Sequence, residues 1–153
     1  MRLWLVAWWP VVLWAGVIFG LSAIPGTQLP PVDLPQADKL AHLLVYAVLG
    51  ALALRGVRRN RQAGDRPPDR DKGSDKRSEK PWPLRPGDVA AAVALTTLYG
   101  ISDEIHQYWT PHRSPDWHDV VADALGGALG SLVFVATRWM KIRVCFMMGR
   151  SKN

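Results

Sequence analysis

The residues best suited to chemistry lie in one short window, Tyr99 to Gly130, with apolar sequence on both sides. The window holds these carboxylate, imidazole, amide and guanidinium groups: Asp103, Glu104, His106, Gln107, Arg113, Asp116, His118, Asp119 and Asp123. Its apolar flanks, 89–101 and 120–139, are long and apolar enough to lie in a bilayer. Ionisable groups at the edge of a membrane are costly and usually have a function, so this window is the default functional site.

A second polar group precedes this window in the chain. The segment that begins at Ala37 is apolar apart from Asp38, Lys39, His42 and Tyr46. Residues 38, 42 and 46 are four apart, so a helix places them on one face, as a polar stripe that enters the membrane from the helix end.

These side chains have the chemistry of a ligand site. Lys39 and Arg113 suit an anionic headgroup, and Arg113 is the better bidentate partner for phosphate or carboxylate. His42, with Asp103 or Glu104 beside it, has the parts of a general base, because a carboxylate orients imidazole and raises its basicity. The predicted ligand-binding residues are Asp38, Lys39, His42, Tyr46, Asp103, Glu104, Gln107, Arg113, Asp116, Asp119 and Asp123.

Other uses of the same residues stay open. The sequence has no Ser or Cys nucleophile motif and no phosphatase or protease signature. The residues with suitable metal-ligand types are Asp38, His42, Asp103, Glu104 and Asp119. They lack a diagnostic spacing such as H-E-x-x-H, so we predict neither a metal nor a cofactor.

The plainest alternative is that the charged groups only pair with one another. The candidate pairs are Lys39 with Glu104, Arg113 with Asp116 or Asp119, and His42 with Asp103. Such pairs would satisfy buried charge and lock the helix ends together without any ligand.

Four apolar segments must position these groups, at about 3–21, 37–54, 89–107 and 120–139. The first exceeds the roughly 7 to 15 residues of a signal-peptide core, so we favour an uncleaved helix over a cleaved signal. A Pro-rich loop, Ser22 to Gln36, follows it. Gly126 and Gly130 form a small-xxx-small pair that allows close helix packing. We therefore predict an all-α polytopic membrane protein with four transmembrane helices in a single domain, 1–153.

Basic residues give the expected orientation. Residues 55–88 hold 11 of the 19 Lys and Arg and almost no apolar side chains, so we predict a charged, disordered cytoplasmic loop. Five more follow from Arg138 onward, whereas the connection before Lys39 has none. The positive-inside rule then places both termini in the cytoplasm and the polar window on the outer side of the plasma membrane. The net charge of +6 is explained by this topology, so we expect no nucleic-acid partner.

Five motifs occur in order: Asp38-Lys39-x-x-His42-x-x-x-Tyr46-x-x-Leu49-Gly50, Asp103-Glu104-x-x-Gln107, Pro111-x-Arg113, Asp116-x-x-Asp119 and Asp123-x-x-Gly126-x-x-x-Gly130. Together they resemble the signature of VanZ-like membrane proteins. Asp123 stands where that family more often has Asn, and His106, His112 and His118 lie outside the signature. The resemblance implies a VanZ-like membrane domain and a link to resistance against the glycopeptide teicoplanin, but no molecular activity.

We therefore predict a cell-envelope protein that binds or modifies a surface precursor or an antimicrobial directed at it. One alternative is a membrane enzyme that hydrolyses or transfers groups on a lipid-linked phosphate or ester. Another is an assembly partner with no small ligand. The expected partners are the lipid bilayer and an anionic envelope lipid or lipid-linked precursor.

Overall fold

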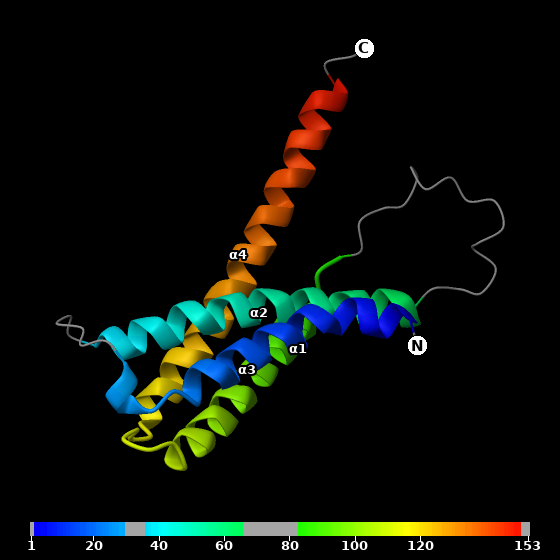
Figure 1. Cartoon of the computed structure of the whole chain (residues 1–153). Coiled ribbons are helices and arrows are strands. Elements are labelled where there is room, and N and C mark those ends of the chain that lie inside the picture. The colour runs from blue at the N-terminus through cyan, green and yellow to red at the C-terminus, as the bar shows by residue number, and fades with distance from the viewer. Residues whose placement is uncertain (1, 30–35, 66–82, 151–153) are drawn as a thin grey trace.

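The computed structural model describes residues 2–29, 36–65 and 83–150 and confirms the predicted all-α fold (Figure 1). Its elements are α1 (Arg2–Ser22), the short 3-10 helix η1 (Gly26–Gln28), α2 (Ala37–Gly64), α3 (Pro86–Tyr108) and α4 (Trp117–Arg150). No strand occurs in the described ranges. The described residues thus form four long helices and their connections.

Three of the helices are long and apolar enough to cross a membrane. The qualifying stretches are Trp4–Ser22 in α1, Ala37–Gly64 in α2 and Trp117–Met140 in α4. The remaining long helix, α3, is not among them. Its last turns carry Asp103, Glu104, His106 and Gln107, so its hydrophobic stretch is shorter.

The prediction that residues 55–88 lack regular structure is wrong for 55–64, which continue α2, and for 86–88, which begin α3. Arginine is a good helix former, so this charged stretch can extend an apolar helix. The extension is also held in place, because Arg61 Nη1 lies 3.1 Å from Asp88 Oδ2 and Nη2 donates to the Pro83 carbonyl at 2.8 Å. The middle of the predicted loop, 66–82, lies outside the described residues.

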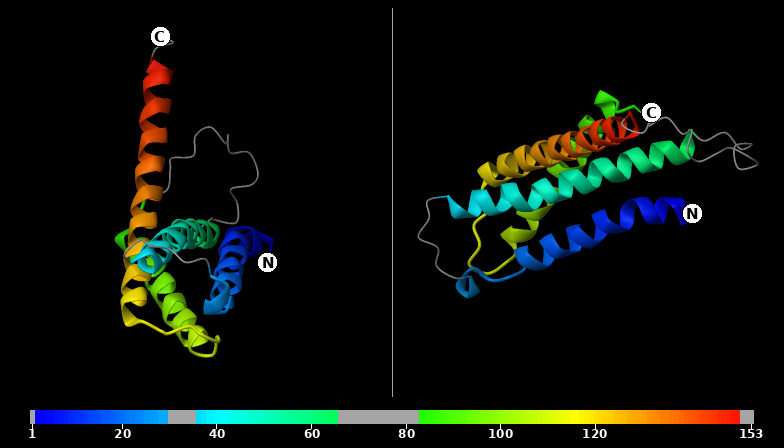
Figure 2. Two further views of the ribbon diagram at one scale, coloured as in Figure 1. Left: turned by 60° about the vertical axis from the view of Figure 1, so that its left-hand side comes forward. Right: turned by 90° about the horizontal axis from the view of Figure 1, so that it is seen from above.

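Helix α2 is the centre of the arrangement. It lies between α1 and α4 in both views of Figure 2, and α3 packs beneath it. A Cβ atom at Gly126 would meet the carbonyl oxygen of Leu43, and one at Gly130 would meet that of Ala47. The two backbones therefore approach closely, as the Gly126–Gly130 spacing predicts, and α2 and α4 make the most extensive contact among the described helices.

Two of the long-range hydrogen bonds that join helix α1 to the bundle lie near its middle. Trp14 Nε1 donates to the Val45 carbonyl at 2.9 Å, and the Tyr99 hydroxyl donates to the Ala15 carbonyl at 2.6 Å. A small core of Ile18, Tyr46 and Leu49 lies between α1 and its neighbours. The C-terminal end of α1 is thereby held beside the start of α2.

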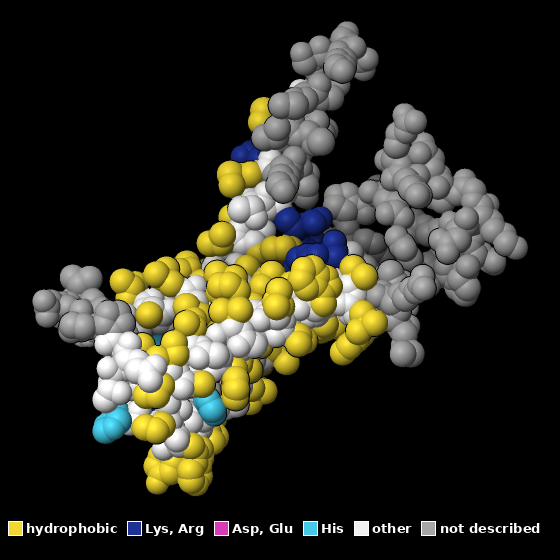
Figure 3. Space-filling view, in the orientation of Figure 1, with side chains coloured by type: hydrophobic (Ala, Val, Ile, Leu, Met, Phe, Trp, Pro, Cys, Tyr) yellow, Lys and Arg dark blue, Asp and Glu magenta, His cyan; other side chains and the backbone are white. Residues whose placement is uncertain are grey.

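The surface matches this architecture. Hydrophobic side chains cover the outer faces of α1 and α2 in the space-filling view, as a lipid environment requires (Figure 3). Lys and Arg side chains gather where α2 meets α4, away from the end where α2 begins (Figure 3). The face seen in Figure 3 is thus apolar over α1 and α2, with a basic region beside α4.

Candidate functional site

The site lies where α1 and α3 end and α2 and α4 begin (Figure 1). These four helix ends meet because the connections after α1 and α3 both lie at this end of the bundle. The Gly26 N–H donates to the Pro111 carbonyl at 3.1 Å, which ties the two connections together. The predicted polar stripe on α2 and the predicted window on α3 and α4 are therefore brought into one region.

A cavity of about 550 Å³ opens at this region. Its apolar lining residues include Ile18, Leu21, Ile24, Leu29, Ala41 and Val45. Its lining also contains six of the predicted ligand-binding residues: Asp38, His42, Tyr46, Asp103, Gln107 and Arg113. Residues 38, 42 and 46 line it together, as their helical spacing predicts.

Lys39 lies beside this cavity and gathers three carboxylates. Its Nζ is 2.9 Å from Asp116 Oδ2, 3.1 Å from Asp38 Oδ2 and 3.3 Å from Asp119 Oδ1. The suggested pairing of Lys39 with Glu104 is not the one formed. The backbone N–H of His118 and then Lys39 hold the pKa of Asp116 well below its usual range, so this carboxyl stays ionised.

His42 pairs with Asp123 rather than with Asp103. The Nδ1 atom lies 2.9 Å from Asp123 Oδ1, and the Asp123 side chain is fully buried. Room for this carboxylate comes from Gly100, where a Cβ would collide with the Asp123 side chain. The pairing therefore links α2 to α4, and the Asp123 side chain also lies against Gly100 of α3.

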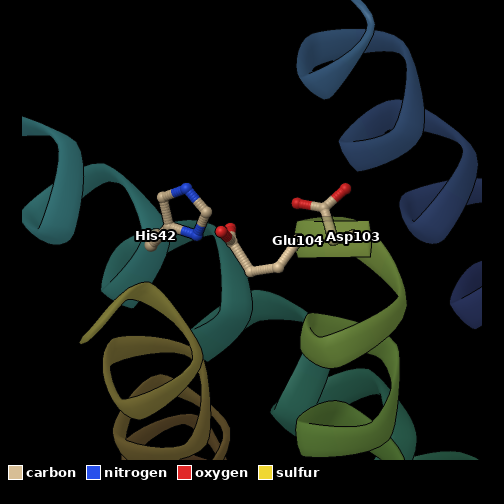
Figure 4. A group of neighbouring side chains, drawn as sticks. All are labelled: His42, Asp103 and Glu104. Atoms are coloured by element: carbon tan, nitrogen blue, oxygen red, sulfur yellow. The ribbon is translucent and has the colours of Figure 1, made fainter. Parts of the chain in front are cut away.

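The adjacent carboxylates of α3 face His42. Asp103 Oδ2 accepts a hydrogen bond from Ser22 Oγ at 2.8 Å, and Glu104 Oε2 accepts one from the Asp116 N–H at 2.8 Å. Gln107 Nε2 donates to both carboxylates at 3.3 Å. Figure 4 shows His42, Asp103 and Glu104 pointing toward one another from α2 and α3. The three predicted catalytic candidates are thus brought together.

Arg113 makes no ion pair with Asp116 or Asp119, so that suggested pairing is wrong. Its Nε donates to the Ile24 carbonyl and its Nη2 to the Leu21 carbonyl, each at 3.3 Å. The guanidinium therefore anchors the connection between α3 and α4 to the end of α1. It also lines the cavity.

Sequence reasoning missed the contribution of α1. Ser22 lines the cavity and donates to Asp103, and Ile18 and Leu21 form part of its apolar wall. The available signal was the position of Ser22, the first hydroxyl after a long apolar run. Among the histidines outside the motifs, His106 stacks on Phe19 with ring centroids 4.3 Å apart, and His118 contacts Asp116.

Comparison with known proteins adds one family. The family model described as VanZ/LLP1 matches residues 5–140. That range contains every predicted site residue and most of each helix. No curated protein and no solved structure matches the chain.

Proposed function

The chain belongs to the VanZ/LLP1 family, and on this basis we propose that it is a multi-pass protein of the cell membrane that binds an amphipathic envelope molecule. The molecule is a surface precursor, or an antimicrobial directed at that precursor. Binding to such a molecule would connect the protein to glycopeptide resistance.

The observation that carries this proposal is the mixed wall of the cavity. A volume of about 550 Å³ lies in the range of small-molecule sites, which are mostly apolar with a few convergent polar groups. The apolar wall suits a lipid chain or another hydrophobic group. The polar wall, which includes Arg113 and His42, suits a headgroup.

The proposed orientation has four spans, with α3 crossing beside the three more apolar helices and both termini in the cytoplasm. Basic side chains concentrated at one end of the bundle support it, and the opposite end then faces outward with the cavity. In this arrangement the cavity is reached from the outer leaflet.

The orientation can be tested with single cysteines at Asn60 and Pro115 in a Cys145→Ser background. Both positions are exposed: Asn60 lies near the end of α2 and Pro115 in the connection between α3 and α4, and these two segments are at opposite ends of the bundle. A membrane-impermeant thiol reagent applied to intact cells should label position 115 and spare position 60 until the membrane is opened. Labelling of position 60 in intact cells would contradict an outward-facing cavity.

A second candidate, a membrane enzyme acting on a lipid-linked phosphate or ester, is favoured by the contact between His42 and Asp123. A carboxylate that holds one imidazole nitrogen orients the ring and raises its basicity, as a general base requires. Turnover of a purified lipid precursor by the purified protein would separate this candidate from binding alone.

The cavity itself can be tested by filling it. Val45 lines the cavity, whereas Val48 lies exposed on the same helix, so Val45→Trp and Val48→Trp form a matched pair. In cells that lack the gene, the Val48 variant should restore the susceptibility pattern toward glycopeptides and other envelope-directed antibiotics. The Val45 variant should fail to do so at equal membrane abundance. Equal activity of both variants, together with a stable co-purifying protein, would instead favour an assembly partner with no small ligand.

A further inference from the structure

We propose that one divalent transition-metal ion, such as Zn²⁺, binds at the edge of the cavity through His42 and Asp103, which line it, and the neighbouring Glu104. One ligand atom from each side chain lies within 4.8 Å of the others, and both carboxylates are buried. Figure 4 shows the three groups converging on one space between α2 and α3. Imidazole together with carboxylate is a ligand set that Zn²⁺ accepts in proteins.

The charge balance of this region favours a cation. Asp103, Glu104 and Asp123 are 3%, 7% and 0% exposed. Within the described residues, none of the three pairs with a Lys or Arg side chain, because Lys39 is taken up by other carboxylates and Arg113 by backbone carbonyls. Their hydrogen-bond donors are a hydroxyl, an amide, a backbone N–H and His42. Buried carboxylates without a compensating charge are costly, and a divalent ion would supply that charge.

Tyr46 gives an independent sign of a missing ligand. Its side chain is 1% exposed and lines the same cavity, with its ring nearly parallel to that of His42 at 6.1 Å. Its hydroxyl has no hydrogen-bond partner in the part of the chain that the structure describes. Buried hydroxyls normally have a hydrogen-bond partner. We therefore expect an ordered group in the cavity, such as a metal-bound water or anion, to form a hydrogen bond with the Tyr46 hydroxyl.

Asp123 completes the arrangement as a positioning residue. A metal-bound histidine commonly gives its other ring N–H to a carboxylate, which fixes the tautomer and orients the ring. Asp123 Oδ1, at 2.9 Å from His42 Nδ1, is in that position. The tautomer that donates Nδ1–H to Asp123 keeps its lone pair on Nε2.

This inference rests on the proposed function, because the metal would meet the headgroup of the bound molecule. The predicted site residues include six carboxylates but only two cations, so an anionic headgroup would be repelled by the protein alone. Three protein ligands leave a position on the metal open for an oxygen of that headgroup. The sequence did not predict the site because its ligands come from two helices and lack a local motif.

Zn²⁺ alone is the first probe. The full chain, purified in detergent without a histidine tag and stripped with a chelator, would be titrated with Zn²⁺ by calorimetry in the absence of lipid. We expect one ion per chain. The zinc X-ray absorption spectrum should show imidazole and carboxylate ligands at about 2.0 to 2.2 Å. A sulfur ligand at about 2.3 Å would reveal Cys145 instead and overturn the proposal.

Substitutions then assign the ligands. Asp123→Asn should weaken Zn²⁺ binding by about 10–100-fold, as expected for a partner of a metal-bound histidine. His42→Gln, Asp103→Asn and Glu104→Gln should each weaken it further. The matched control is Asp65→Asn, a carboxylate at the other end of α2 and outside the group, and it should leave the affinity unchanged.

Two further results would overturn the metal site: no stoichiometric binding to the wild-type chain, or a spectrum without imidazole. Both use wild-type protein, so they decide the question even if a variant does not fold. The metal and the amphipathic ligand can also fail separately. Val45→Trp should retain Zn²⁺ binding, and if Val45→Trp also kept full activity in cells, the ligand proposal would fall while the metal site stood.

Discussion

At the end of the bundle where α2 finishes, Arg61 and Asp88 form an ion pair, whereas at the end where α2 begins, carboxylates outnumber the cations that reach them. Asp88 also accepts a hydrogen bond from the Arg85 N–H, so its charge is balanced by a cation and a backbone donor. By contrast, Asp103, Glu104 and Asp123 have mostly neutral donors. A closed pair of charges stabilises a fold, and an unbalanced set is suited to a ligand. The two ends should therefore respond differently to substitution.

The largest effect on stability is expected at the closed pair. Asp88→Asn leaves Arg61 largely buried without its carboxylate, which should lower the free energy of unfolding by about 3 kcal/mol, at the low end for a broken buried pair. Melting of the detergent-solubilised protein measures this loss. The phenotype should fall only in proportion to membrane abundance. Loss of function at normal abundance would show that this end also has a ligand.

Glu104→Gln should have the opposite pattern. Glutamine keeps the size and one acceptor for the Asp116 N–H, so unfolding should change by no more than about 1.5 kcal/mol. The negative charge is lost, and with it the predicted ligand site, so the susceptibility phenotype should disappear while abundance stays normal. If the phenotype instead followed membrane abundance in this variant, as in Asp88→Asn, the charged groups at both ends of the bundle would serve only to stabilise the fold.

The comparison also shows what sequence could and could not predict. The apolar runs and the 38, 42, 46 spacing were sufficient to predict the helices and one wall of the cavity, because helical periodicity fixes which residues share a face. The pairings were not predictable in the same way. Whether His42 meets Asp103 or Asp123 depends on how three helices rotate and approach, and here Gly100 and Gly126 allow the closer contact with α4.

The end of α2 was mispredicted for a different reason. A composition rich in charge and poor in apolar residues is typical of disorder, and it outweighed the helix propensity of the individual arginines. The contact between Arg61 and Asp88 involves residues on either side of the connection, so it becomes visible only when α2 and α3 are placed together.

Arg113→Lys tests how far the site depends on its framework. The guanidinium donates to two carbonyls at the end of α1, and a lysine cannot reproduce both bonds. The expected loss of stability is about 0.5 to 1.5 kcal/mol, smaller than for Asp88→Asn. A matched Arg113→Gln variant removes the charge as well. If the Lys variant restores function and the Gln variant does not, the positive charge contacts the ligand. If both variants fail equally, function requires the planar guanidinium that holds the connection between α3 and α4 to the end of α1.

The smallest effect is expected from shortening the charged connection between α2 and α3. This deletion tests whether the basic residues at that end of the bundle serve only to orient the protein in the membrane. Deleting residues 66–78 leaves the end of α2, the contact between Arg61 and Asp88, and four basic residues, Arg55, Arg58, Arg59 and Arg61, in place. Loop-closure entropy depends only weakly on length, and each halving of a flexible loop changes stability by about 0.6 kcal/mol. Insertion, melting and the susceptibility phenotype should therefore stay close to wild type. The disruptive control is a second deletion of the same total length whose span includes Arg55 to Arg61. Loss of phenotype at normal membrane abundance after the 66–78 deletion would mean that the connection binds a partner, and function could then no longer be assigned to the carboxylate-rich end alone.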